Sequence, residues 1–141
     1  MRQAANLTGV KGALWHTLLQ EIPYDPSLSI VDSFPVCRFA GEAAYGYDDK
    51  QIFYGFRSHL RVCWPGVIVA VDLAPANVHD LAMLEEMAAD AQGWLLGDRN
   101  FWSPPKQAAI AAQGLHLCAP FKHASHPGPA GWSKCAAASK L

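Results

Sequence analysis

The sequence lacks the features of membrane proteins and of disulfide-rich secreted domains. None of its apolar runs approaches the roughly 18 uninterrupted residues of a membrane-spanning helix, and the first residues contain no apolar stretch typical of a secretion signal. The four cysteines are far apart, and no two have the spacing of a zinc knuckle. We therefore expect a cytoplasmic chain with no membrane partner and no disulfide or zinc framework.

Charged residues are also scarce, and positive charge does not dominate. Only 16% of the residues are charged, and the formal net charge is −1. Proteins that hold DNA through its phosphates need clustered Lys and Arg, so the overall charge argues against that class. Hydrophobic residues, in contrast, make up 51% of the 141 residues, which predicts one domain with a real core.

The spacing of the apolar residues predicts a mixed sheet with helices packed on it. Turn signals such as Pro65-Gly66 and the glycines Gly93 and Gly114 separate the segments. In order, the predicted elements are a helix over Val10–Glu21, strands over Leu28–Val36, Gln51–Trp64 and Val67–Leu73, a helix over Asp80–Gln92, a strand over Trp94–Leu96, a helix from Pro104 or Pro105 to Gln113, and a strand over Leu115–Ala119.

Two aspartates occupy similar places in this pattern. Asp32 lies inside an apolar strand, and Asp98 follows the end of another, directly after Gly97. Burying an unpaired carboxylate is costly, and two carboxylates on neighbouring strands can hold a divalent cation between them. The alternative is that each aspartate only caps a backbone turn.

Several short motifs, taken together and in order, support the first interpretation. They are Ile30–Pro35, Tyr45–Tyr47, Phe53–Leu60, Leu73–Asp80, Leu96–Phe101 and Leu117–Lys122. This series resembles the catalytic domain of bacterial insertion-sequence transposases of the DDE class, in the family numbered nine hundred and eighty-two. The resemblance implies an RNase H-like α/β fold and the metal-dependent cleavage and joining of DNA at transposon ends.

The resemblance also implies roles for individual residues. Asp32 and Asp98 match the first two catalytic carboxylates, which together with a glutamate hold Mg²⁺ or Mn²⁺ in the family. Asp80 and His59 match recurring positions without an assigned role. The residues expected to contact DNA are Arg57, His59, Arg61, Arg99 and Lys122. Three of these, Arg57, His59 and Arg61, share one strand face, which can equally be the solvent-facing side of a half-buried strand.

The third carboxylate of the family is missing. The chain contains no Asp or Glu after Asp98, whereas the family carries its glutamate on a basic helix beyond the last strand. Suitable codons for the tail, read in another frame, spell that basic segment, so we infer a frameshift near Ser125 or His126. We then expect weak metal binding, a catalytically dead chain and an RNase H-like domain that is incomplete at its C-terminus. The expected division is residues 1–27, a helical remnant; 28–122, the partial catalytic domain; and 123–141, an irregular tail.

Other functions remain open at this stage. The chain can be a non-catalytic remnant that binds DNA, a full-length transposase or a second copy of itself. It can also be a small metal-dependent nuclease in which Asp72 replaces the lost glutamate.

Overall fold

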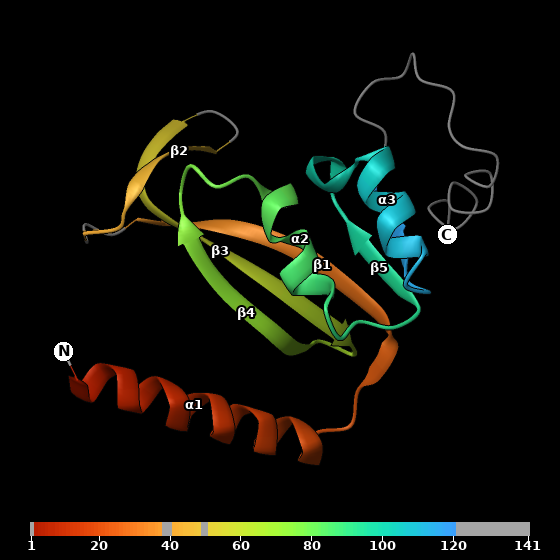
Figure 1. The fold of residues 1–141 in the computed structure, drawn as a ribbon, viewed down its shortest axis with the longest axis horizontal. Coiled ribbons are helices and arrows are strands. Elements are labelled where there is room, and N and C mark those ends of the chain that lie inside the picture. Colours follow the sequence, from red (N-terminus) through yellow and green to blue (C-terminus); the bar gives the residue numbers. More distant parts are fainter. Residues whose placement is uncertain (1, 38–40, 49–50, 121–141) are drawn as a thin grey trace.

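The computed structural model describes residues 2–37, 41–48 and 51–120, with the side chains of residues 2–8 left out (Figure 1). In chain order the elements are α1 (Arg2–Glu21), β1 (Asp25–Cys37), β2 (Ala44–Asp48), β3 (Gln51–Trp64), β4 (Val67–Pro75), α2 (Asp80–Ala88), β5 (Trp94–Gly97), the 3-10 turn η1 (Arg99–Phe101), α3 (Pro104–Ala111) and β6 (His116–Cys118). Every predicted element is present. The sequence pattern did not predict β2 and η1. Lys122 and the tail over 123–141 lie outside the described residues.

The strands form one six-stranded mixed sheet. The order is β2-β3-β1-β5-β6, and β4 also pairs with β3. Strand β3 pairs antiparallel with both β1 and β4. Strand β5 pairs parallel with β1, and β6 pairs parallel with β5. Because α2 connects β4 to β5 and α3 connects β5 to β6, the topology confirms the predicted RNase H-like α/β fold.

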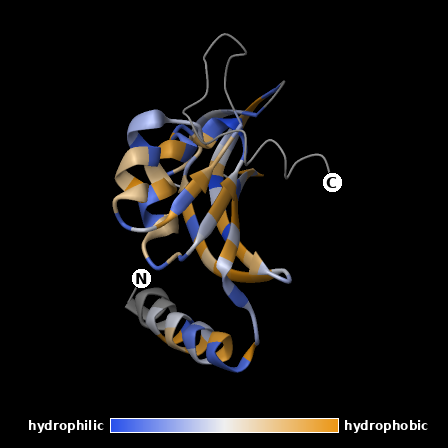
Figure 2. Ribbon diagram, turned by 90° about the vertical axis from the view of Figure 1, so that its right-hand side faces the viewer, coloured by the Kyte–Doolittle hydropathy of each residue, from blue (hydrophilic) through white to orange (hydrophobic). Residues whose placement is uncertain are grey.

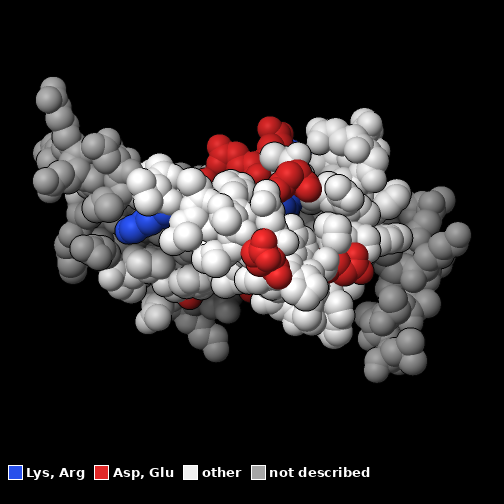
Figure 3. Space-filling model, turned by 90° about the horizontal axis from the view of Figure 1, so that it is seen from below, with Lys and Arg blue, Asp and Glu red and all other residues white. Residues whose placement is uncertain are grey.

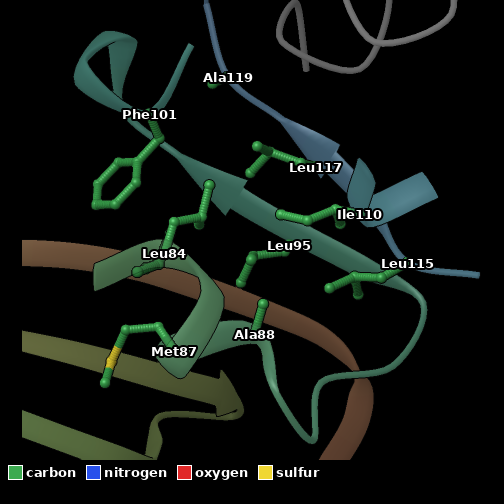
Figure 4. Close-up of a cluster of buried hydrophobic side chains, with 10 residues drawn as sticks. Leu84, Met87, Ala88, Leu95, Phe101, Ile110, Leu115, Leu117 and Ala119 are labelled. Atoms are coloured by element: carbon green, nitrogen blue, oxygen red, sulfur yellow. The ribbon is translucent and has the colours of Figure 1, made fainter. Parts of the chain in front are cut away.

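One face of the sheet is covered by helices. Strand residues alternate between the two faces, and directly paired residues share a face. Ser29, Val31 and Ser33 of β1 pair with Cys63, Arg61 and His59 of β3, and this side packs against α2 and α3 (Figure 2). We call it the covered face. Its core contains Val31, Leu84, Leu95, Phe101, Ile110 and Leu117, most of which are labelled in Figure 4.

The opposite side, the open face, is apolar but exposed. It is defined by Leu28, Ile30, Asp32 and Phe34 of β1, Leu60 and Val62 of β3, Ile68, Val71 and Leu73 of β4, and Trp94 and Leu96 of β5. Ile30 is 52% exposed and Val71 54% exposed. Among the described residues, no element covers these side chains as α2 and α3 cover the other face (Figure 2).

Helix α1 lies apart from the other helices. In Figure 1 it lies below β4, outside the layers formed by the sheet and α2. Its apolar side chains Val10, Leu14 and Leu18, and Ile22 directly after its end, are all exposed. No helix among the described residues combines the length and apolarity of a membrane span.

Candidate metal site beside the pairing of β1 and β5

The strand register ends one residue before the two candidate aspartates. In the parallel pair of β1 and β5, Val31 lies opposite Gly97. Asp32 is the next residue of β1 and lies on the open face by strand alternation, whereas Asp98 directly follows the last residue of β5 and caps η1. Both side chains are exposed to solvent. The prediction that the two aspartates belong to neighbouring strands is therefore confirmed.

Each aspartate also makes a local hydrogen bond to the backbone. Asp32 Oδ1 accepts a hydrogen bond from Ser33 N at 2.8 Å. Asp98 Oδ1 accepts one from Asn100 N at 2.8 Å, which caps η1, and its Oδ2 accepts one from Asn100 Nδ2 at 3.1 Å. An ionised carboxylate has about four acceptor positions, so these contacts leave acceptor capacity on both groups.

The described residues provide two carboxylates but no third ligand. They contain no group of three or more His, Cys, Asp or Glu side chains placed to hold a metal ion. Two carboxylates suit Mg²⁺ or Mn²⁺ in donor chemistry, because Mg²⁺ commonly takes one or two protein carboxylates and completes its shell with water and phosphate. The pair therefore fits a divalent cation chemically, with fewer protein ligands than a complete site would have.

The sequence itself decides the family. A model of the transposase DDE domain matches residues 34–128, well over half of the chain. The chain belongs to the DDE transposases. No curated protein and no solved structure matches it. The matched range contains Asp98 and begins just after Asp32. DDE transposases as a family bind DNA and use divalent metal ions.

Asp72 cannot complete the transposase site. It lies opposite His59 in the pairing of β3 and β4, which places it on the covered face. There it forms a hydrogen bond with Glu86 of α2, and this bond, together with the negative charge of Asp72, raises the pKa of the Glu86 carboxyl. The hypothesis of a nuclease that uses Asp72 with Asp32 and Asp98 is therefore wrong, because the sheet separates the side chains.

The two recurring positions His59 and Asp80 meet beneath α2. Asp80, the first residue of α2, is almost fully buried and accepts a hydrogen bond from Ser33 Oγ at 2.7 Å. His59 Nδ1 lies 3.7 Å from Asp80 Oδ1. The histidine is 0% exposed, and within the described part of the chain neither of its ring nitrogens has a hydrogen-bond partner. Burial lowers its pKa, and the nearby Asp80 carboxylate opposes this shift only in part.

This cluster positions the strand that carries Asp32. Ser33, which Asp80 holds, is the next residue along β1, and Arg57 Nη1 donates a hydrogen bond to the same Ser33 Oγ at 3.3 Å. The cluster therefore fixes β1 from the covered face at the point where Asp32 projects from the open face. Asp80 is a structural partner of the candidate site and does not lie on the face of the aspartate pair.

Arg61 and His59 are not available to DNA. Arg61 is only 3% exposed; it donates a hydrogen bond to the Met87 carbonyl oxygen at 2.8 Å and forms an ion pair with Asp90. Both residues lie on the covered face, so the expectation that they contact DNA is wrong. The alternative that they face solvent is wrong for the same reason. Helix α2 covers this face and supplies the Met87 carbonyl to Arg61, and Asp90, just beyond the helix, supplies the carboxylate.

The other basic candidates differ in exposure. Arg57 is half-buried, donates to the Tyr47 carbonyl oxygen at 2.8 Å and lies over the Phe53 ring. Arg99 is exposed directly beside Asp98. On the side of the molecule that Figure 3 shows, acidic side chains outnumber basic ones. Contact of Arg57, Arg99 and Lys122 with DNA stays a prediction.

A cavity that the sequence did not predict reaches Asn100, the hydrogen-bond partner of Asp98. It has a volume of about 690 Å³ and is lined by residues of β2, of the segment entering α2 and of η1. Asn100 lines the cavity and also bonds to Asp98. Its wall depends on Gly46, because a Cβ atom there would lie 2.5 Å from the Ala76 carbonyl oxygen. Gly46 is the central residue of the Tyr45–Tyr47 motif, but no local sequence pattern predicts that this glycine packs against Ala76.

Proposed function

We propose that this chain is a transposase remnant that binds DNA and a divalent cation weakly and does not cut or join DNA on its own. The observation that supports the proposal is the register of β1 and β5, in which Val31 pairs with Gly97, so that Asp32 and Asp98 each follow directly after a paired residue. No third ligand accompanies them among residues 2–37, 41–48 and 51–120. We further propose that the chain derives from the insertion-sequence family numbered nine hundred and eighty-two.

Each part of the proposed site has a separate task. Asp32 and Asp98 would hold the cation, and Asn100 orients the Asp98 carboxylate. Asp80 and Ser33 hold β1 in register from beneath. Mg²⁺ or Mn²⁺, when bound, would supply charge stabilisation at the phosphate that is transferred. With only two carboxylates the chain supplies less negative charge to the cation than three would, so we expect weak binding.

The end of the sequence supports a lost third carboxylate. No Asp or Glu follows Asp98, and the family match ends at residue 128, shortly after the frameshift that we place near Ser125 or His126. The nucleotide sequence of the gene tests this directly. The bases after His126 should encode a basic, glutamate-containing segment in another frame, and a gene without such a segment would contradict the frameshift.

Phosphate contact is the proposed role of Arg99. Arg99 is exposed beside Asp98, where DNA that approached the aspartate pair would pass. We expect binding that falls steeply with salt, because it depends on phosphate neutralisation. In a gel-shift titration on duplex DNA, Arg99→Ala should weaken binding, whereas Lys106→Ala should not, because Lys106 is engaged with Glu85 on α2.

A cleavage assay on duplex oligonucleotides that carry the inverted repeats flanking the gene tests the catalytic part. The chain should make no nick with Mg²⁺ or Mn²⁺, and a version with the restored frame should cleave. In that version Asp32→Asn and Asp98→Asn should each abolish cleavage, whereas Glu42→Gln, a change at an exposed acid, should not. A metal-dependent nick by the present chain that disappears in Asp32→Ala would refute the proposed inactivity.

A further inference from the structure

The cavity that reaches Asn100 has no task in the proposed metal site. Its volume of about 690 Å³ lies within the range of about 300–1,000 Å³ of sites that bind small molecules. It lies where β2 meets the segment that enters α2, at one end of the sheet (Figure 1). Aromatic rings, side-chain amides and carboxylates line it. These groups indicate which kind of ligand the cavity takes.

One wall of the cavity consists of aromatic and apolar side chains from the β2–β3 hairpin. Tyr45 and Tyr47 are two residues apart on β2, and Tyr47 pairs with Ile52 of β3, so the three side chains share one face. They are 72%, 63% and 73% exposed, and all three line the cavity. We call this surface the hairpin wall. The Tyr45 ring meets the Tyr54 ring edge-on at 4.8 Å, which restrains its position. A planar group can therefore stack on the hairpin wall.

The polar part of the lining both donates and accepts hydrogen bonds. Asn77 and Asn100 each bring an amide, which carries two N–H donors and a carbonyl acceptor. Asp48 adds a carboxylate, which accepts when it is ionised. The edges of nucleobases likewise carry donors and acceptors side by side. The combination of an aromatic wall and mixed polar groups therefore matches a nucleobase.

The charges around the cavity argue against an anion such as phosphate. Two carboxylates, Asp48 and Asp80, line the cavity together with one arginine, Arg57. The Arg57 guanidinium already donates to a backbone carbonyl and to a serine hydroxyl within the chain. His79 Nδ1 accepts a hydrogen bond from Leu81 N, as an imidazole that is unprotonated at this nitrogen does. An uncharged planar ligand fits these surroundings better than a phosphate, which the two carboxylates would repel.

We propose that the cavity holds one unpaired nucleobase of a bound DNA strand. The base stacks on the hairpin wall, and its edge meets the amides of Asn77 and Asn100. Asn100 favours a DNA strand over a free nucleotide as the source of the base. Its side-chain amide donates to Asp98 Oδ2 at 3.1 Å, so a base in the cavity contacts the residue that orients the proposed metal ligand. The inference rests on the proposed binding of DNA and names the part of the strand that the chain recognises.

Fluorescence anisotropy with two matched duplexes tests the nucleobase site. One duplex is fully paired, and the other has the same length and charge but one unpaired base. The wild-type chain should bind the second roughly 5- to 150-fold more tightly, which is the range of base–aromatic stacking. Tyr45→Ala/Tyr47→Ala should lose this preference, and Tyr45→Phe/Tyr47→Phe, which keeps both rings, should retain it. Trp64→Ala, the matched control, removes an exposed ring at the other end of β3 and should also retain it.

Salt and a phosphate-contact variant separate this site from the proposed function. Added salt should weaken binding to both duplexes and leave their ratio unchanged, because both carry the same number of phosphates. Arg99→Ala should also weaken both equally. Equal binding of the two duplexes by the wild-type chain would overturn the nucleobase site and leave the proposed DNA binding standing. A chain that binds neither duplex would contradict the DNA binding itself and, with it, a DNA strand as the source of the base.

Adenosine as a competitor distinguishes the two sources of a base. At millimolar concentration it should reduce the preference for the unpaired duplex and leave binding of the paired duplex unchanged. A preference that adenosine does not reduce would show that the unpaired base is recognised outside the cavity. Adenosine binding that is lost in Tyr45→Ala/Tyr47→Ala, without any preference for the unpaired duplex, would assign the cavity to a free nucleoside and overturn the DNA source.

Discussion

In most sheets the apolar side chains are buried and the polar ones face water, but on β3 this arrangement is reversed. On β3, the polar residues Arg57, His59 and Arg61 point to the covered face, and the apolar residues Leu60 and Val62 point to the open face. Polar groups can be buried when they have hydrogen-bond partners, and Arg61 has them in the Met87 carbonyl oxygen and Asp90. His59 has only the Asp80 carboxylate nearby, 3.7 Å away. An exposed apolar face has no such compensation. The comparison shows that the open face is the incomplete one, and it is the face that carries Asp32.

The largest expected difference concerns apolar truncation on the two faces. Leu95→Ala removes a fully buried side chain at the centre of the core (Figure 4) and should lower the free energy of unfolding by about 2–5 kcal/mol. Ile30→Ala, on the neighbouring strand but on the open face, should cost less than about 1 kcal/mol in the monomer. Urea unfolding at low protein concentration measures both. Equal losses would show that the open face is already covered within one chain.

The sequence predicted the elements but not which face would be buried. The alternation of residue types predicted both ends of β3 correctly. Alternation by itself, however, only divides the side chains into two sets on opposite faces and does not say which set is buried. The usual assumption is that the polar set faces water, and for His59 and Arg61 this assumption failed. The groups that face them, Asp80 and the Met87 carbonyl in α2 and Asp90 just beyond it, lie more than twenty residues further along the chain, and no local pattern connects them to β3.

A buried arginine and an exposed arginine offer the next comparison. Arg61→Met keeps much of the side-chain volume but leaves the Met87 carbonyl and Asp90 without their donor, so it should cost roughly 1–3 kcal/mol of stability. Arg99→Met, at an exposed position, should change stability by less than about 0.5 kcal/mol. Chemical unfolding gives both values, and gel shifts should rank the two variants in the opposite order for DNA binding. A stable Arg61→Met variant with weak DNA binding would contradict the burial of Arg61.

In the candidate site, too, features that depend on local sequence were predicted, and features that depend on contacts between distant residues were not. Asp32 and Asp98 were singled out because one lies inside a recognisable strand pattern and the other directly follows one, but the parallel pairing of β1 with β5 was not predicted. The cavity that reaches Asn100 was not predictable. It requires Gly46 of β2 to pack against Ala76, and β2 lies in a glycine-rich segment whose strand character comes from pairing with β3.

The smallest expected effect is the pH dependence that the buried His59 produces. Because burial lowers the pKa of His59, the unfolded chain binds a proton before the folded chain does as the pH falls. Stability is thus fully present above an ordinary histidine pKa of about 6.5 and declines below it, by at most about 0.7 kcal/mol between pH 7 and pH 6. Unfolding titrations at several pH values should show this slope in the wild-type chain, and His59→Leu should reduce it. His16→Leu, which removes an imidazole from exposed α1, is the matched control. If His59→Leu left the slope unchanged, the protonation of His59 would not be linked to folding, and its position beneath α2 would lack the energetic consequence that burial requires.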